Sequence, residues 1–204
     1  MILDERLLNA ENFLNQLHAT INNIDIPNSD RIRAATTCFG IARDHHHAII
    51  LLIRETFYAS SFALLRILFE SYLRGLWLSV CSTDTQACNI MNGGKFPEYF
   101  EIIEQIEKIP EFNEVLFFSS IKKKYWKILC DYTHTGGLHL QRWNRNNAIE
   151  PKYTNQEIEE VLGFAEFFGA MAALGIAQLS TLNSVEIAVT DQISMRWPSI
   201  IVKE

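Results

Sequence analysis

The sequence predicts an all-α protein, a single-domain bundle of six or seven helices with no sheet. Apolar residues recur every three or four positions over long stretches, which is the period of helices that bury one face. Several of these stretches begin at helix-capping residues and end at glycine. Signals for strands are weak, because few runs alternate between apolar and polar residues.

Length and charge restrict the class of protein. The 204 residues suffice for one domain, 1–204, with a sizeable core that we place at 30–183. A net charge of −6 gives no overall attraction to nucleic acid or to an anionic membrane. The four cysteines have no C-x-x-C spacing, and no basic region with a long apolar core opens the chain. We therefore expect a cytoplasmic protein with reduced thiols.

The first two predicted helices lead into a short turn. The first spans about 4–23 and buries one side. The second is capped within 28–30, runs to about 56, and is apolar all round over 48–53, so we expect its end to be enclosed. The short connection then returns the chain antiparallel to it.

The third helix, 59–82, is the predicted centre of the bundle. Its 24 residues include only three charges, Arg66, Glu70 and Arg74, which are spaced four apart and therefore share one stripe. The rest of its surface is apolar, so other helices must surround it. The three charges must then find partners or line a cavity.

The remaining chain is predicted as several shorter segments and one long helix. Thr83 and Thr154 each precede Gln or Glu by three residues, which is the spacing of a capping box. Glycine pairs at 93–94 and 136–137 indicate helix ends. Helical segments are expected over 83–92, 97–108, 111–133, 154–183 and 185–195, and an ordered loop over 136–153.

The stretch 162–182 is long enough to cross a bilayer and has one charge, Glu166. Glu166, Gln178 and Ser180 are poorly placed for lipid, and the many small residues permit close approach of helices in water as well. We therefore expect a second core helix and no membrane partner.

The stripe of Arg66, Glu70 and Arg74 is the first candidate site. Two guanidiniums on one stripe can grip a phosphate or a carboxylate, with Glu70 fixing their rotamers. The alternative is a structural ion network, in which Glu70 bridges the arginines four residues before and after it.

The helix end at 131–137 is the second candidate. It places His134 beside a Gly-Gly turn, and His139 and Arg142 follow within reach. Histidine suits proton transfer near neutral pH. The alternative is that His134 caps its own helix and that Gly136 is the left-handed residue after it.

The third candidate lies within 43–47, where an arginine and an aspartate precede three consecutive histidines. Consecutive residues point in different directions on a helix, so the histidines cannot chelate one metal together. His46 falls on the apolar stripe and is expected to be a core histidine. Arg43 and His47 share a face of the helix.

Asp-x-x-His spacing occurs twice, at Asp44/His47 and at Asp131/His134. Paired motifs of this kind, with further carboxylates, hold two metals in some helical bundles. Glu70 offers a third ligand, but no fourth is evident, and aspartate replaces the usual glutamate. We therefore predict no metal and no cofactor.

Two motifs carry a resemblance over residues 59–177. They are Arg-x-x-x-Glu-x-x-x-Arg-Gly-Leu-Trp-Leu at 66–78 and Tyr-Thr-His-x-Gly at 132–136. With them the chain resembles an uncharacterised family of all-helical bacterial proteins, a domain of unknown function. The resemblance implies a helical fold and a bacterial origin, supplies no activity, and suggests that the third helix and the His134 turn meet.

The organisation is also similar to the helical nuclease domains of bacterial toxin and anti-phage systems. Their signature is an arginine with a polar neighbour, followed by a histidine after four to six intervening residues. Here only three residues lie between Arg43 and His47, so the signature is not met.

These observations predict a polar cleft that binds a small anionic ligand or a nucleotide through a phosphate or carboxylate. One alternative is an enzyme that cleaves RNA or nucleotides, with a histidine as acid or base. Another is a structural module that forms a homodimer through its small-residue helix. The predicted catalytic residue is His134, and the predicted ligand-binding residues are Arg66, Glu70, Arg74, His139 and Arg142.

Overall fold

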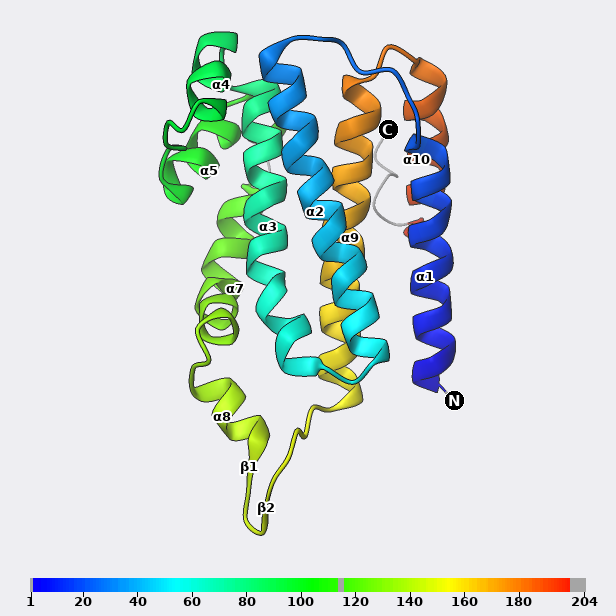
Figure 1. Cartoon of the computed structure of the whole chain (residues 1–204), viewed down its shortest axis with the longest axis vertical. Helices are drawn as coiled ribbons and strands as arrows, with labels where there is room; N and C mark the ends of the chain where they lie inside the picture. The colour runs from blue at the N-terminus through cyan, green and yellow to red at the C-terminus, as the bar shows by residue number, and fades with distance from the viewer. Residues whose placement is uncertain (1, 114–115, 199–204) are drawn as a thin grey trace.

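Four long helices run along the length of the protein in the computed structural model (Figure 1). The structure describes residues 2–113 and 116–198. Helices α2 and α3 lie antiparallel, as the short turn between them predicts, and α9 packs against both. The four helices are α1 (Ile2–Ile21), α2 (Asp30–Arg54), α3 (Tyr58–Val80) and α9 (Asn155–Leu179).

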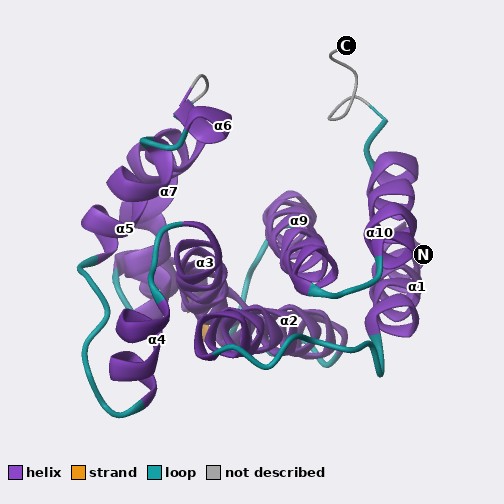
Figure 2. Ribbon diagram, turned by 90° about the horizontal axis from the view of Figure 1, so that it is seen from above, coloured by secondary structure: helices purple, strands orange, loops and turns teal. Residues whose placement is uncertain are grey.

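Shorter helices and a hairpin complete the described chain. In Figure 2, α4, α5, α6 and α7 lie on one side of α3, whereas α1 and α10 lie beyond α9. The two strands pair antiparallel, with Asn144 opposite Ile149. The elements are α4 (Asp84–Met91), α5 (Tyr99–Glu107), α6 (Pro110–Asn113), α7 (Phe117–Thr133), α8 (Gly137–Trp143), β1 (Asn144–Arg145), β2 (Ala148–Ile149) and α10 (Asn183–Arg196).

The all-α class is confirmed, but the predicted count of six or seven helices is wrong. The described residues form ten helices and one two-stranded hairpin. The segment predicted over 111–133 contains the end of α6 as well as α7, and the predicted loop over 136–153 contains α8 and the hairpin. Helices α6 and α8 and the hairpin strands are shorter than the 11 or more residues over which apolar periodicity becomes visible.

Side-chain caps fix the starts of α2, α4 and α9, as predicted. Ser29 caps α2 by accepting a hydrogen bond from the backbone N–H of Ile32. Thr83 and Thr154 form capping boxes with Gln86 and Glu157, at the starts of α4 and α9. Each box satisfies backbone donors that a helix leaves without a partner in its first turn.

The core lies where α2, α3 and α9 meet, and glycine allows their close contact. The fully buried ring of Phe39 on α2 lies between Gly75 of α3 and Gly175 of α9. A Cβ atom would approach the ring to 2.7 Å at Gly75 and to 2.6 Å at Gly175. Because the small residues of α9 are used inside the bundle, the predicted homodimer, which stays a prediction, would need another surface.

Helix α9 is a core helix, as predicted. Among the residues that the structure describes, it is the one helix long and apolar enough to cross a membrane, and 61% of its most apolar window is buried inside the protein. Its charge Glu166 is 1% exposed and is paired within the bundle. Arg6 Nη2 of α1 lies 2.6 Å from Glu166 Oε2, and Arg196 Nη2 of α10 lies 2.8 Å from Oε1.

Removing the Glu166 carboxylate should strongly destabilise the fold. In Glu166→Ala, Arg6 and Arg196 lose a buried partner, so we expect the free energy of unfolding to fall by about 3–5 kcal/mol. Urea denaturation followed by circular dichroism measures the change. The control is Glu159→Ala, which removes the outer partner of Arg6 and should cost less than about 1 kcal/mol. Equal losses would contradict a central role for the buried pair.

Candidate functional site

Arg66, Glu70 and His134 meet on one face of α3. Arg66 Nε donates to Glu70 Oε1 at 2.8 Å, and its Nη1 lies 2.9 Å from Nε2 of His134. The guanidinium carbon of Arg66 also lies 4.6 Å from the ring centre of Trp126, which is a cation–π contact. The contact between the third helix and the His134 turn is therefore confirmed.

The contact with Arg66 defines the protonation of His134. A guanidinium can only donate, so Nε2 of His134 must accept and the neutral ring carries its proton on Nδ1. The side chain is exposed, whereas Arg66 and Glu70 are half-buried. Nε2 of His134 can therefore exchange a proton only when its contact with Arg66 is broken.

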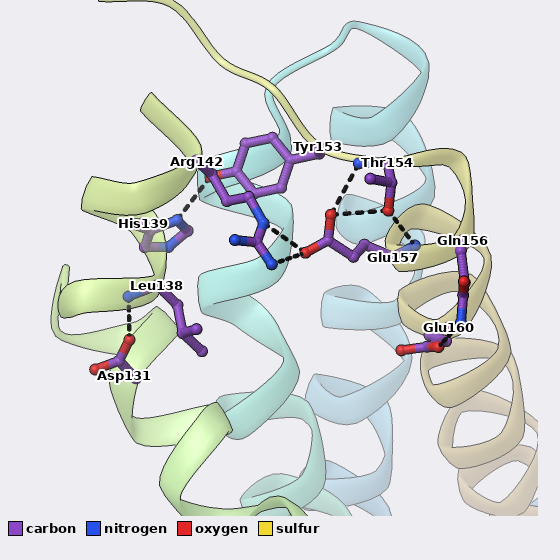
Figure 3. A network of polar contacts seen from close by, with 9 residues as sticks. All are labelled: Asp131, Leu138, His139, Arg142, Tyr153, Thr154, Gln156, Glu157 and Glu160. Carbon is purple, nitrogen blue, oxygen red and sulfur yellow. Dashed lines mark hydrogen bonds and ion pairs between the residues drawn. The ribbon is translucent and has the colours of Figure 1, made fainter. Parts of the chain in front are cut away.

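The turn after His134 differs from the alternative in which His134 only caps its own helix and Gly136 is the left-handed residue. His134 is the C-cap residue of α7, but its ring reaches α3, and the left-handed residue is Thr135, with a φ of 54°. Gly136 has a φ of −77° and is needed for space, because a Cβ there would lie 2.0 Å from Oδ1 of Asp131. The carboxylate of Asp131 also accepts from the backbone N–H of Leu138 at 2.6 Å and so fixes the start of α8 (Figure 3).

Arg74 does not join this cluster. It is exposed, and its guanidinium carbon lies 4.9 Å from the ring centre of Phe96. Within the described chain, no ion pair links it to Glu70. Arg74 lies eight residues after Arg66, so its side chain is rotated by about 80° around the helix axis relative to that of Arg66. This rotation is enough to direct it to a different neighbour. The ion network of the alternative interpretation therefore contains Arg66 and Glu70 without Arg74.

His139 is buried with both ring nitrogens occupied. Nε2 lies 3.0 Å from the backbone oxygen of Tyr132 and Nδ1 lies 2.7 Å from the hydroxyl of Tyr153 (Figure 3). The carbonyl can only accept, so Nε2 carries the proton and Nδ1 accepts from Tyr153. Burial lowers the pKa of His139, partly opposed by the hydrogen bond to Tyr132 and the charge of Asp131. This neutral ring joins α7, α8 and the segment before α9.

Arg142 is held by a carboxylate on α9. Its Nε donates to Glu157 Oε1 at 2.5 Å, and Nη2 contacts the same oxygen. The second oxygen of Glu157 accepts from the backbone N–H of Thr154 at 2.8 Å and from its hydroxyl at 2.9 Å (Figure 3). The hydrogen bond to Glu157 raises the pKa of Arg142, with burial acting in the opposite direction. The capping box of α9 thus also positions Arg142.

A cavity of about 690 Å³ lies beside Arg142, with walls from α7, α8 and α9 and a floor from α3. Ring contacts of Phe117 with Phe167 and of Tyr125 with Phe164, at centroid distances of 5.7 and 6.3 Å, connect α7 and α9. The lining is mainly apolar, with polar groups at the edge. The apolar lining includes Phe62, Leu65, Ile128, Leu129, Leu138, Val161 and Phe164, and the charged lining is Arg142, Lys152, Glu157 and Glu160.

The predicted residues therefore occupy three separate places. Of the six predicted site residues, all of which the structure describes, Arg142 alone lines this cavity. Arg66, Glu70 and His134 form a cluster between α3 and the end of α7 that does not line the cavity, while Arg74 and His139 have partners elsewhere. The single cleft expected from the sequence is absent from the described part of the chain.

Sequence reasoning did not find the cavity itself. Its lining comes from α3, α7, α8, the segment before α9, and α9, and apart from Arg142 each side chain looks like an ordinary core or surface residue in sequence. The one available signal was the capping box at Thr154, because the same Glu157 that caps α9 holds Arg142.

The Asp-x-x-His pairs do not assemble a metal site in the described residues, which contain no group of three or more histidine, cysteine, aspartate or glutamate side chains able to hold an ion. One oxygen of Asp131 is bound to the start of α8, and His134 faces Arg66.

The fold and these sites define an all-α bundle with an apolar side cavity and a separate exposed Arg–His cluster. The chain belongs to a family of unknown function, DUF6988, whose model matches residues 39–200. Searches of curated proteins and of solved structures found no match. The matched range includes the whole cavity and the Arg66 cluster, whereas α1 precedes it.

The close approach of Asp131 makes Gly136 sensitive to substitution. In Gly136→Ala the new methyl group must displace the carboxylate that holds α8, so we expect a loss of about 1–3 kcal/mol in the free energy of unfolding. Gly137→Ala is the matched control, because a Cβ there meets no atom within 4 Å among the described residues. Urea denaturation of both variants measures the difference, and equal stabilities would show that Asp131 does not constrain this turn.

Proposed function

We propose that this protein binds a small amphipathic anion in the cavity between α7, α8 and α9. The observation that supports the proposal is an apolar cavity of about 690 Å³ with an arginine held at its edge by a fixed carboxylate. Pockets for small molecules typically have volumes of about 300–1,000 Å³, mostly apolar walls and a few placed polar groups.

The apolar part of the cavity favours a ligand with an aromatic or aliphatic body. Phe62 and Leu65 of α3 line it together with Leu129 of α7 and Val161 and Phe164 of α9. Burial of apolar ligand surface is favourable by about 25 cal/mol per Å². The half-buried ring of Phe164 additionally offers an aromatic surface for stacking.

The edge of the cavity favours a single anionic group. Arg142 uses Nε and Nη2 for Glu157, and its Nη1 has no hydrogen-bond partner in the described chain. Lys152 lines the same cavity. Because Glu157 and Glu160 also lie there, a ligand with several anionic groups is disfavoured, whereas one carboxylate or one phosphate ester is suited. The fixed rotamer of Arg142 reduces the entropy lost on binding.

A panel of aromatic and aliphatic carboxylates and monophosphates tests this proposal by thermal shift and calorimetry. We expect at least one compound to stabilise the protein, with affinity reduced about tenfold or more in Arg142→Gln, because a charge-assisted hydrogen bond is lost. The control is Arg145→Gln, which removes an exposed arginine of the hairpin paired with Glu150 and should leave affinity unchanged. No stabilisation by the panel, or equal affinity in Arg142→Gln, would refute the proposal.

A second candidate function is acid–base cleavage of RNA or a nucleotide at the Arg66 cluster. The observation that favours it is the 2.9 Å contact between Arg66 and His134, which places a cation beside an exposed imidazole. If a phosphate takes the guanidinium of Arg66, Nε2 of His134 becomes free to move a proton. Arg66 then stabilises the charge that develops on the phosphate.

The test of this second candidate is RNA cleavage by the purified protein. We expect His134→Ala to abolish cleavage without lowering the melting temperature, because the imidazole is exposed and its one described hydrogen bond is to Arg66. His45→Ala, on α2, is the control for loss of a histidine elsewhere. Cleavage that persists in His134→Ala, or absence of cleavage by the unaltered protein, would reject this function.

A further inference from the structure

A second cavity, of about 290 Å³, lies between α1 and α2 and is lined mainly by polar residues. It is separate from the cavity of the proposed function, with which it shares no lining residue. Leu14, Leu17 and Gly40 contribute apolar surface. The polar lining consists of Asn15, His18, Arg43, Asp44, His46 and His47.

Arg43 is a half-buried cation without an ion-pair partner in the described residues. Its one hydrogen bond joins Nη2 to Nδ1 of His18 at 3.3 Å. Burial lowers the pKa of Arg43, which the charge of Asp44 only partly offsets. A charge withdrawn from water without a partner is unfavourable, so this guanidinium is suited to receive an anion. By contrast, carboxylates pair with Arg6, Arg54, Arg66, Arg142, Arg145 and Arg196.

His46 supplies a second group with an unused hydrogen-bonding capacity. The side chain is 2% exposed, and its Nε2 has no hydrogen-bond partner in the described part of the protein. Burial, with the neighbouring Arg43 and His47, lowers the pKa of His46 to about 3, so the ring is neutral at physiological pH. It is also fixed in position, because a Cβ at Gly169 of α9 would lie 2.1 Å from its Nδ1.

We propose that the cavity between α1 and α2 binds a single phosphate group through the guanidinium of Arg43, with the neutral ring of His46 as part of the cavity wall. His18, His47 and Asn15 line the same space and offer further hydrogen-bond donors. Asp44 also lines the cavity, but it is exposed, so water screens its repulsion of an anion.

The size of the cavity limits the ligand. A volume of about 290 Å³ is at the lower end of the range of about 300–1,000 Å³ for small-molecule pockets. It suits inorganic phosphate or the phosphate end of a small monoester, whose remainder would extend past the exposed side chains of His18 and His47.

Calorimetric titration with inorganic phosphate, against sodium chloride at matched ionic strength, tests the proposal. We expect saturable binding that Arg43→Gln weakens about tenfold or more. Arg43→Gln should remain folded, since it removes an unpaired charge, and the melting temperature without phosphate checks this. His18→Asn alters an exposed side chain and should weaken binding by a smaller factor, which keeps the test valid if Arg43→Gln does not fold.

Arg33→Gln is the matched control, because it removes an exposed arginine of α2 that does not line this cavity, and it should bind phosphate as the unaltered protein does. A parallel titration with adenosine monophosphate distinguishes the source of the phosphate, and it is carried out in Arg142→Gln so that the cavity of the proposed function does not contribute. Tighter binding of the nucleotide supports a monoester, and equal or weaker binding supports the free ion. The proposal would be overturned if phosphate binding is not saturable. It would also be overturned if Arg43→Gln and His18→Asn both bind phosphate as tightly as the unaltered protein does.

Discussion

The need to cover two apolar helices on most sides organises this protein. Helices α3 and α9 carry fully buried aromatic rings, Phe62 and Phe69 on α3 and Phe168 on α9, so neither can lie at the surface along its whole length. Helix α2 joins them through Phe39, which fits between two glycines, and α1, α7 and α10 cover the remaining faces. The buried charge of Glu166 on α9 is paired with Arg6 of α1 and Arg196 of α10.

The same constraint creates the candidate site. Helix α7 packs on α3, and its aromatic contacts with α9 at Phe117 and Tyr125 leave a cavity nearer α8. The Arg142–Glu157 ion pair links α8 to α9 at the edge of that cavity. Arg66 of α3 and His134 at the end of α7 do not line this cavity and contact each other instead, so one helix pair supports two chemically different sites.

Local patterns in the sequence predicted what depends on neighbouring residues. The capping residues Ser29, Thr83 and Thr154, the antiparallel turn before α3, and the burial of α9 follow from spacing and composition. Arg74 could not be placed in the same way, because a stripe spaced by four drifts around the helix. The cavity depends on how distant elements pack, and the start of α8 is held by a contact with Asp131 that the sequence pattern does not reveal.

The central claim is that a small anion binds between α7, α8 and α9. A crystal structure with a compound that stabilises the protein in solution tests this most directly. The account predicts the apolar body of the ligand between Phe62 and Phe164 and its anionic group at Nη1 of Arg142. A ligand bound at the Arg66–His134 cluster, or one whose anionic group lies away from Arg142, would contradict it.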